Sequence, residues 1–257
     1  MKVKDITAAI ERFAPLSIQE GWDNSGLAVG SPEDEVHGVL VGFDCTKELI
    51  DEAVAEGCDL VVTHHPLIFH GIKKLCPGDP VSDTVIAAVR AGVAVYAAHT
   101  TADKVLAGVS GAMARRLELQ DITLMEDEGG FGLGAVGTLL RPMTGEEAIA
   151  YVKEKFGLRT VRVSRPVDRV EKVAMCGGSG ASEIDAARAS GAQLYISGDI
   201  SYHHFFTPAD FMVMDIGHFE SEVDIVGILF KVIREKFPTF AVRISDNLGR
   251  SNPVRYY

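Results

Sequence analysis

The chain has 257 residues, 47% of them apolar and 24% charged, which is typical of a soluble globular protein with one large domain or two modest ones. Its 25 basic and 36 acidic residues give a net charge of −11, which argues against nucleic acid as a partner but not against a small anionic ligand bound to a metal ion. No apolar run reaches the ~20 residues of a membrane helix, and residues 1–15 resemble an amphipathic helix rather than a secretory signal. We therefore expect a cytoplasmic protein with no membrane partner.

Short apolar runs alternate with helical patterns through the first half of the chain. This order is typical of parallel strands covered by helices, so it predicts an α/β fold. The expected strands are residues 39–43, 60–63 and 93–98, and the expected helices are residues 47–56, 83–91 and 102–117.

At residues 126–134 the sequence becomes acidic and rich in glycine, which predicts a domain boundary. A smaller α/β unit is expected after it. In it we predict strands at residues 135–140 and 160–163 and a helix that starts at Thr144. The chain then continues with strands at residues 170–175, 193–197 and 211–215, a helix at residues 183–190 and a last helix at residues 221–236.

Residues 39–65 and 173–199 align without a gap and share identical residues such as Val39/Val173 and Leu60/Leu194. Both segments are predicted to form strand, helix and strand. The similarity predicts two related units, of which only the first has a pair of histidines.

Three predicted strands are followed by residues that commonly bind metal ions. His64 and His65 follow the second strand, Asp103 lies beyond the third, and His218 with Glu222 follows the last. Because the carboxyl ends of parallel strands meet at one edge of a sheet, imidazole and carboxylate groups would converge there. The pattern predicts a metal centre.

Adjacent histidines can serve one site only if the strand has already ended, and Pro66 favours that. Two neighbouring ions suit such a pair better than one. We assign His64 and Asp103 to one ion, His65 and His218 to the other, and Glu222 to both, because Glu222 shares a helix face with His218. His99 is a further ligand, an orienting residue or a substrate contact.

Other motifs leave alternatives open. The Gly-Gly-Ser-Gly segment at 177–180 either cradles a phosphate before a helix or forms a tight turn, with Ser182 capping that helix. Asp23 is a candidate to line the cleft. The remaining candidates are His99 and His203 for catalysis, and Asp44, Gly178 and Asp199 for substrate binding.

The four cysteines, at positions 45, 58, 76 and 176, form no Cys-x-x-Cys pair, and their irregular spacing favours neither a zinc ribbon nor a disulfide framework. We expect all four to be reduced, with Cys58 and Cys176 in the core.

The chain contains an ordered set of motifs: GWDNSGLAVG at 21–30, VGFDCT at 41–46, THHPLIF at 63–69, HTTAD at 99–103, GGSG at 177–180, SGDISYHH at 197–204 and GHFESE at 217–222. Together these motifs resemble the Nif-three-like family of GTP cyclohydrolase I type 2 homologues. The family's motif at the position of residues 99–103 usually reads HTNLD, so Asp103 is kept here and the Asn is not.

The resemblance implies a dinuclear divalent-metal site at His64, His65, Asp103, His218 and Glu222. It also implies a ring-shaped homohexamer and two α/β domains with mostly parallel central sheets flanked by helices, the second inserted before the last strand and helix of the first. We expect the metal-binding domain at 1–128 plus 211–257 and the inserted domain at 129–210.

Two bridged divalent ions predict a hydrolase that activates water for attack on a small-molecule substrate, nucleotide-like or phosphorylated. A non-catalytic scaffold or metal-storage protein is the alternative, and a metal-free structural assembly is a third reading. Three imidazoles and two carboxylates suit zinc, iron, manganese, cobalt or nickel.

Overall fold

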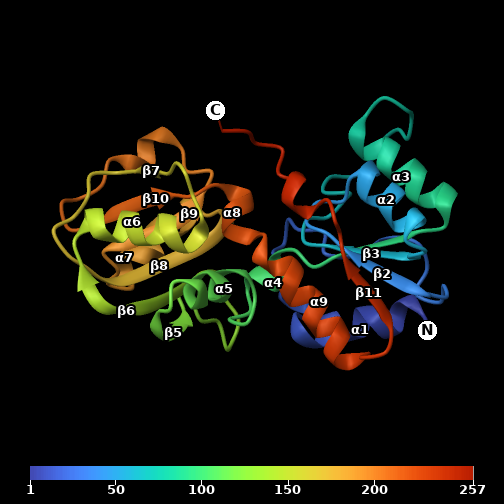
Figure 1. Ribbon diagram of the computed structural model, residues 1–257, viewed down its shortest axis with the longest axis horizontal. Coiled ribbons are helices and arrows are strands. Elements are labelled where there is room, and N and C mark those ends of the chain that lie inside the picture. The colour runs from blue at the N-terminus through green and yellow to red at the C-terminus, as the bar shows by residue number, and fades with distance from the viewer. Residues whose placement is uncertain (257) are drawn as a thin grey trace. The chain divides into compact units, whose positions relative to one another are not determined.

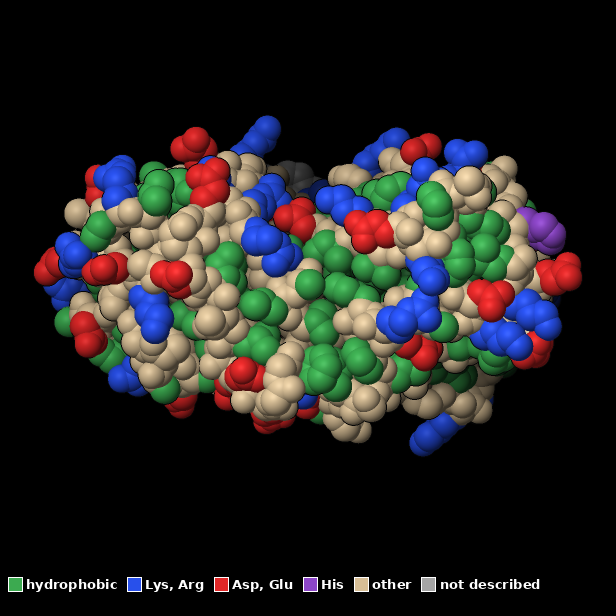
Figure 2. All heavy atoms as spheres, turned by 90° about the horizontal axis from the view of Figure 1, so that it is seen from below, with side chains coloured by type: hydrophobic (Ala, Val, Ile, Leu, Met, Phe, Trp, Pro, Cys, Tyr) green, Lys and Arg blue, Asp and Glu red, His purple; other side chains and the backbone are tan. Residues whose placement is uncertain are grey.

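The computed structural model describes residues 1–256, which form two compact units. Unit 1 contains residues 1–102 and 225–255, and unit 2 contains residues 103–224 and Tyr256. No helix within residues 1–256 is long and apolar enough to cross a membrane. On the face drawn in Figure 2, acidic and basic side chains are interspersed, with hydrophobic side chains between them.

Strands and helices alternate through most of unit 1. Its strands are β1 (Gly26–Val29), β2 (Gly38–Val41), β3 (Leu60–Thr63), β4 (Ala94–Ala97) and β11 (Ala241–Ile244). Its helices are α1 (Val3–Phe13), α2 (Lys47–Ala55), α3 (Pro80–Ala91) and α9 (Asp224–Lys236), with the 3-10 helices η1 (Leu16–Ile18) and η4 (Leu248–Arg250); α4 (Thr100–Asp103) lies at the end of its first segment.

The sheet of unit 1 has five strands in the order β1-β4-β3-β2-β11. The strands β4, β3, β2 and β11 are parallel, and β1 is antiparallel to β4. Figure 1 shows α2 and α3 on one side of this sheet and α1 and α9 on the other. Helices on both faces explain why every residue of β2, β3 and β4 is buried.

The helices of unit 1 begin where capping side chains satisfy their first amides. Thr46 caps α2 by accepting from the amide of Leu49 over 3.3 Å. Asp79 caps α3 by accepting from the amide of Ser82 over 2.9 Å, and Pro80 occupies the first helical turn. This cap is why α3 begins before residue 83, where the apolar pattern alone placed its start.

Unit 2 is a mixed α/β structure around one sheet. Its strands are β5 (Gln120–Leu124), β6 (Ala135–Met143), β7 (Arg162–Val163), β8 (Val170–Ser179), β9 (Leu194–Gly198) and β10 (Met212–Asp215). Its helices are α5 (Val109–Arg116), α6 (Gly145–Phe156), α7 (Ile184–Ala189) and α8 (His218–Glu222), with η2 (Ala181–Glu183) and η3 (Tyr202–Phe205).

The second sheet has six strands in the order β5-β6-β8-β9-β10-β7. Only β8, β9 and β10 are mutually parallel; β5, β6 and β7 pair antiparallel with their neighbours. The expectation of a mostly parallel sheet is therefore correct for unit 1 and wrong for unit 2. Between β6 and β8 the chain passes through α6 and the additional strand β7, so no single strand-helix-strand crossover joins these two neighbours, and they run antiparallel.

The internal similarity corresponds to equivalent structures. In unit 1, β2 pairs in parallel with β3 and Val39 lies opposite Leu60. In unit 2, β8 pairs in parallel with β9 and Val173 lies opposite Leu194. These are the same four aligned residues, so the two strand-helix-strand segments share their register as well as their sequence pattern.

The units divide at other residues than the expected 128/129 and 210/211. The strand β10 was expected in the first domain, but it pairs with β9 and β7 in the second sheet. Residues 103–128 belong to unit 2 because α5 packs on β8 and β5 pairs with β6. Unit 1 resumes with α9 and β11, so unit 2 is inserted before the last helix and strand.

Two expected helices are broken. Residues 102–117 form α4 and α5 with a break between them, because Gly108 has a ψ of −142° and caps a new helix instead of continuing the first. Residues 221–236 contain the end of α8 and all of α9. The break lies at Val223, directly after Glu222.

Candidate metal centre

The two adjacent histidines lie just beyond β3, which ends at Thr63. The backbone amides of His64 and His65 both donate to the carbonyl oxygen of Phe43, over 3.1 and 3.2 Å. Because one carbonyl receives both amides, the chain curls around it, and the side chains need not alternate between faces as in a strand. The two imidazole rings lie side by side, with centroids 4.9 Å apart.

His99 joins this pair from the loop after β4. One ligand nitrogen from each of His64, His65 and His99 lies within 4.8 Å of the other two. His64 is fully buried, and the His99 side chain is 14% exposed. Unit 1 thus brings together three imidazoles that could hold a metal ion.

Each of these three histidines has an oxygen atom at hydrogen-bonding distance from Nδ1. The oxygens are the carbonyl of Ala98 for His64 at 2.9 Å, the carboxylate of Asp44 for His65 at 2.7 Å and the carboxylate of Asp23 for His99 at 2.7 Å. An acceptor at Nδ1 places the proton there, so the lone pair of the neutral ring is at Nε2. Proteins fix metal-binding imidazoles in this way.

Asp23 is the centre of a hydrogen-bond network that holds His99. Besides His99, its carboxylate accepts from the hydroxyl of Ser25 over 2.7 Å and from the hydroxyl of Thr100 over 2.6 Å. Burial by itself would raise the pKa of Asp23, but the hydrogen bonds from His99 and Thr100 outweigh it, and the pKa lies well below its usual range. Asp23 is therefore a fixed negative charge behind His99, rather than a residue that lines a cleft.

The histidine of unit 2 has carboxylates at both ring nitrogens. Gly217, at φ +95°, turns the chain from β10 into α8, as expected for a sharp turn. The Nδ1 atom of His218 lies 2.8 Å from the carboxylate of Asp199, and its Nε2 atom lies 3.0 Å from the carboxylate of Glu222, one turn later. A lone pair and a carboxylate oxygen repel each other at that distance, so a cation, either a proton or a metal ion, must lie between Nε2 and Glu222.

Asp199 follows β9 directly and has a φ of +50°, in the left-handed region that Asp adopts more readily than most residues other than glycine. Its Oδ2 atom faces His218, so the carboxylate can orient this candidate ligand.

Glu222 is buried, with 4% of its surface exposed, against the glycines that end β8. Burial raises the pKa of the neighbouring Cys176 thiol well above its usual value, and the carboxylates of Asp103 and Glu222 raise it further. Asp103 and Glu222 therefore produce a negative potential in the interior of unit 2. Imidazole nitrogen and carboxylate oxygen are the donors that borderline divalent metals prefer, so the residues present fit such an ion.

The Gly-Gly-Ser-Gly segment is not a phosphate cradle. Gly177 to Ser179 belong to β8, and the following helix, α7, has only six residues and no side-chain cap from Ser182. The amides of Gly177, Gly178 and Gly180 donate to the hydroxyls of Ser110, Ser221 and Ser197. These donors are already used within the protein, so both the phosphate reading and the cap reading are wrong.

Gly178 instead makes room for Glu222. It has a φ of +61°, and a Cβ atom there would overlap the Glu222 carboxylate. We expect Gly178→Ala to lower the melting temperature and to weaken metal retention. Gly191→Ala is the matched control, because Gly191 also has a positive φ, +79°, but has open space around it.

Thermal unfolding monitored by circular dichroism and the metal content of both variants check this prediction. The control should lose only the ~1–3 kcal/mol of backbone strain and should keep its metal. Equal losses in both variants would contradict the packing role of Gly178.

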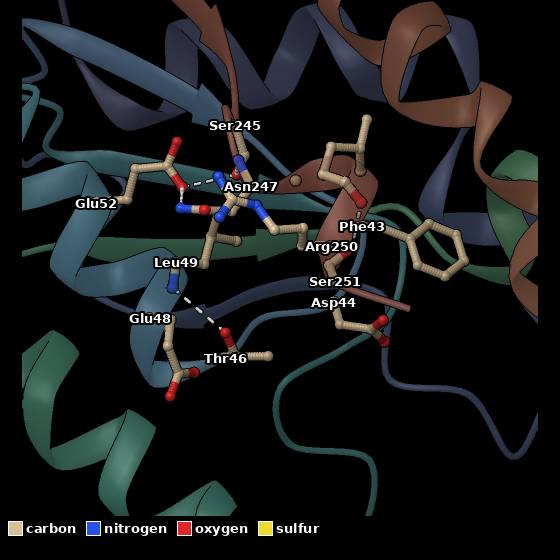
Figure 3. Close-up of a pocket in the computed structure, with 12 residues that line it drawn as sticks. Phe43, Asp44, Thr46, Glu48, Leu49, Glu52, Ser245, Asn247, Arg250 and Ser251 are labelled. Carbon is tan, nitrogen blue, oxygen red and sulfur yellow. Dashed lines mark hydrogen bonds between the residues drawn. The ribbon is translucent and has the colours of Figure 1, made fainter. Parts of the chain in front are cut away.

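Two cavities lie beside Asp44 in unit 1. One, of about 360 Å³, lies between the start of α2 and the segment after β11 (Figure 3). The other, of about 510 Å³, includes His65 and the start of α3 in its lining. The first is lined by Gly42, Phe43, Asp44, Thr46, Glu48, Leu49, Glu52, Ser245, Asn247, Leu248, Arg250 and Ser251.

In the wall of the first cavity, Glu52 of α2 is hydrogen-bonded to the segment that follows β11. Its carboxylate accepts from the hydroxyl of Ser245 over 2.7 Å and from the side-chain amide of Asn247 over 3.0 Å, as Figure 3 shows. Nothing in the sequence pattern of residues 245–251 indicated that they approach α2. Asp44 lines both cavities and also orients His65.

The other candidate residues have different surroundings. His203 is exposed in η3, and its ring contacts are with Tyr202 and Phe206. All four cysteines are free thiols, and Cys58 and Cys176 are buried, as predicted. Burial raises the pKa of Cys45 to about 12, so this thiol stays protonated near neutral pH.

The profile of the family described as Duf34/NIF3 (NGG1p interacting factor 3) matches residues 1–249. A relative from Clostridium acetobutylicum, called "GTP cyclohydrolase 1 type 2 homolog", is 33% identical over 238 residues, which cover 90% of this chain and 89% of the relative. A protein of the same name from Lactococcus lactis is 32% identical and covers 98% of each chain.

Solved structures with the same fold cover nearly the whole chain. A hypothetical protein from Staphylococcus aureus has a TM-score of 0.92 at 24% identity, covering 100% of this chain and 99% of that one. Reduced HcgD from Methanocaldococcus jannaschii has a TM-score of 0.80 at 28% identity and covers 96% of this chain and 98% of that one.

Proposed function

Since the chain belongs to the Duf34/NIF3 family, we propose that it is a divalent-metal-dependent hydrolase that acts on a small nucleotide-like or phosphorylated substrate. Two metal ions would be held by His64, His65, Asp103, His218 and Glu222. The observation that carries this proposal is the oxygen acceptor at Nδ1 of every histidine in the set, with Asp44 and Asp199 as two of the acceptors.

In this proposal His64 and Asp103 would hold one ion, His65 and His218 would hold the other, and Glu222 would serve both. Five protein ligands leave positions open for water and substrate. When bound, such a metal pair supplies a water molecule of lowered pKa and positive charge for a developing oxyanion.

His99 is the proposed acid–base residue. Its Nδ1 atom is fixed by Asp23, and its side chain remains partly exposed beside His64 and His65. With Nδ1 hydrogen-bonded to Asp23, Nε2 is the ring nitrogen that would exchange a proton with water or a leaving group. Asp44 and Asp199 act only through the histidines that they orient.

The reaction is tested with GTP and a panel of phosphoesters, using protein loaded with each candidate metal. Opening of the guanine ring changes the ultraviolet spectrum of the purine, whereas phosphoester hydrolysis releases phosphate and leaves that spectrum largely unchanged. We expect one of these signals in the wild type and a rate at least ~100-fold lower in His99→Gln. A protein that binds two ions but shows neither signal would instead fit the non-catalytic metal-storage or scaffold reading.

The relatives' name points to GTP, and we carry it to this chain only as the first substrate to assay. The ring-shaped homohexamer implied by the family resemblance belongs to the same proposal. Light scattering of the purified protein tests it, with a particle about six times the 27.6 kDa mass of the chain expected.

A further inference from the structure

The only tryptophan of the chain is exposed. Trp22, in the loop before β1, has 59% of its surface accessible, and Phe69, in the loop after β3, has 41%. Their ring centroids are 5.8 Å apart with 54° between the ring planes. Large aromatic side chains contribute most stability when buried, so two exposed rings in contact need an explanation.

Both rings lie next to the candidate catalytic histidine. The ring centroid of His99 is 6.0 Å from that of Trp22 and 6.1 Å from that of Phe69. His99 in turn has a nitrogen within 4.8 Å of ligand nitrogens of His64 and His65. A molecule that covers the two exposed rings is therefore within reach of the imidazole cluster of unit 1.

Hydrogen bonds hold the loops that carry these rings. The side-chain amide of Asn24, two residues after Trp22, donates over 2.6 Å to the carbonyl of Ile68, the residue before Phe69. Asp23, which lies between Trp22 and Asn24, accepts from the amide of Thr100 over 3.1 Å. The aromatic pair is thus mounted on a fixed backbone, which lowers the entropic cost of binding a ligand.

We propose that Trp22 and Phe69 form a stacking platform for a planar nitrogen-heterocyclic ring, such as a nucleobase, of the substrate. This inference rests on the proposed function and specifies its substrate class. Even if each ring buried about 150–250 Å², the pair would cover less than the ~800 Å² per partner of a stable protein interface. The same area suits one stacked base, which would then lie close to His99.

The single tryptophan makes the test direct. Guanosine 5′-monophosphate, added to the full-length protein, is expected to quench Trp22 fluorescence saturably, and ribose 5-phosphate at the same concentrations is not. The titration is repeated after treatment with a chelator. Quenching by the nucleotide should persist there, because stacking on the two rings does not require a metal ion.

Variants connect the signal to the platform. Phe69→Ala is expected to weaken binding of the nucleotide roughly five- to hundredfold, the range for loss of one base–aromatic stack. Phe206→Ala is the matched control, because Phe206 is also an exposed phenylalanine, at 73%, but lies in unit 2. The control should bind like the wild type, and both variants should keep the wild-type circular dichroism spectrum.

Several results would overturn the platform. They are no quenching by the nucleotide, equal quenching by ribose 5-phosphate, or unchanged affinity in Phe69→Ala. A change of particle mass in Phe69→Ala with unchanged nucleotide affinity would assign the rings to contact with another copy of the chain instead. Quenching without any turnover would support the platform and count against the hydrolase, whereas turnover of GTP without quenching would do the reverse.

Discussion

Glu222→Gln is expected to reduce the affinity for divalent metal by at least ~100-fold. Substitution of a residue that only orients a metal ligand typically lowers the affinity 10- to 100-fold, so the expected loss is larger. The substitution keeps the shape of the side chain but removes its charge. In the present structure that charge lies 3.0 Å from Nε2 of His218 and is 4% exposed, so an amide cannot replace it as a bridging ligand. Competition with a fluorescent chelator measures the affinity.

Glu220→Gln is the control for this prediction, because Glu220 is on the same helix but its carboxylate lies beside Gly217 and the Tyr256 hydroxyl. It should retain metal like the wild type. Equal retention in Glu222→Gln and the wild type, with both proteins folded, would show that Glu222 is not a ligand.

Asp23→Asn is expected to lower the free energy of unfolding by about 2–4 kcal/mol at pH 7, because hydrogen bonds to a buried charged group are lost. The Asp23 side chain is fully buried, and its oxygens accept from His99, Ser25 and Thr100. An amide can accept at only one of its two ends. Urea unfolding of metal-free protein measures the difference.

The pH dependence of that difference has a defined sign. The pKa of Asp23 in the folded protein is lowered, since its hydrogen bonds outweigh the effect of burial. Its stabilisation is therefore fully present above the unfolded pKa of about 3.9 and decreases as the pH falls below that value toward the folded pKa. The gap between wild type and Asp23→Asn should narrow between pH 5 and pH 3. A gap that is constant across this range would contradict the role of the carboxylate charge.

The sequence predicts well those helices and strands whose ends are marked by residues nearby in the chain. The range 60–63 matches β3 at both ends, and the expected helix starts at residues 47 and 144 match the first residue of α2 and the N-cap of α6. Apolar runs bounded by capping residues determine these elements without help from distant residues.

The sequence contains no comparable pattern that shows which strands pair with each other. The strands β1, β5 and β11 were missed. β5 and β11 are largely exposed and contain polar residues, so no apolar run marks them, whereas β1 was missed although its residues are apolar. β10 was found as a strand, but its pairing with β9 and β7, which places it in the second sheet, was not predicted. The domain boundaries were misplaced for this reason.

The orienting residues of the candidate site were identified, but not in their roles. Asp44 and Asp199 were selected as substrate contacts because they follow strands, and Gly178 because glycines often bind phosphate. The structure places both carboxylates at Nδ1 of a histidine and Gly178 against Glu222. Such roles depend on distances between side chains of separate elements, which a single sequence does not contain.

The metal content of the wild-type protein tests the central proposal most directly. Elemental mass spectrometry on untagged protein purified without chelator is expected to find about two equivalents of one divalent metal per chain. His65→Ala should contain about one equivalent or less, because it removes an imidazole that Asp44 holds in place. A wild-type protein that contains no metal, and takes up none on reconstitution, would contradict the proposed dinuclear centre and the hydrolase built on it.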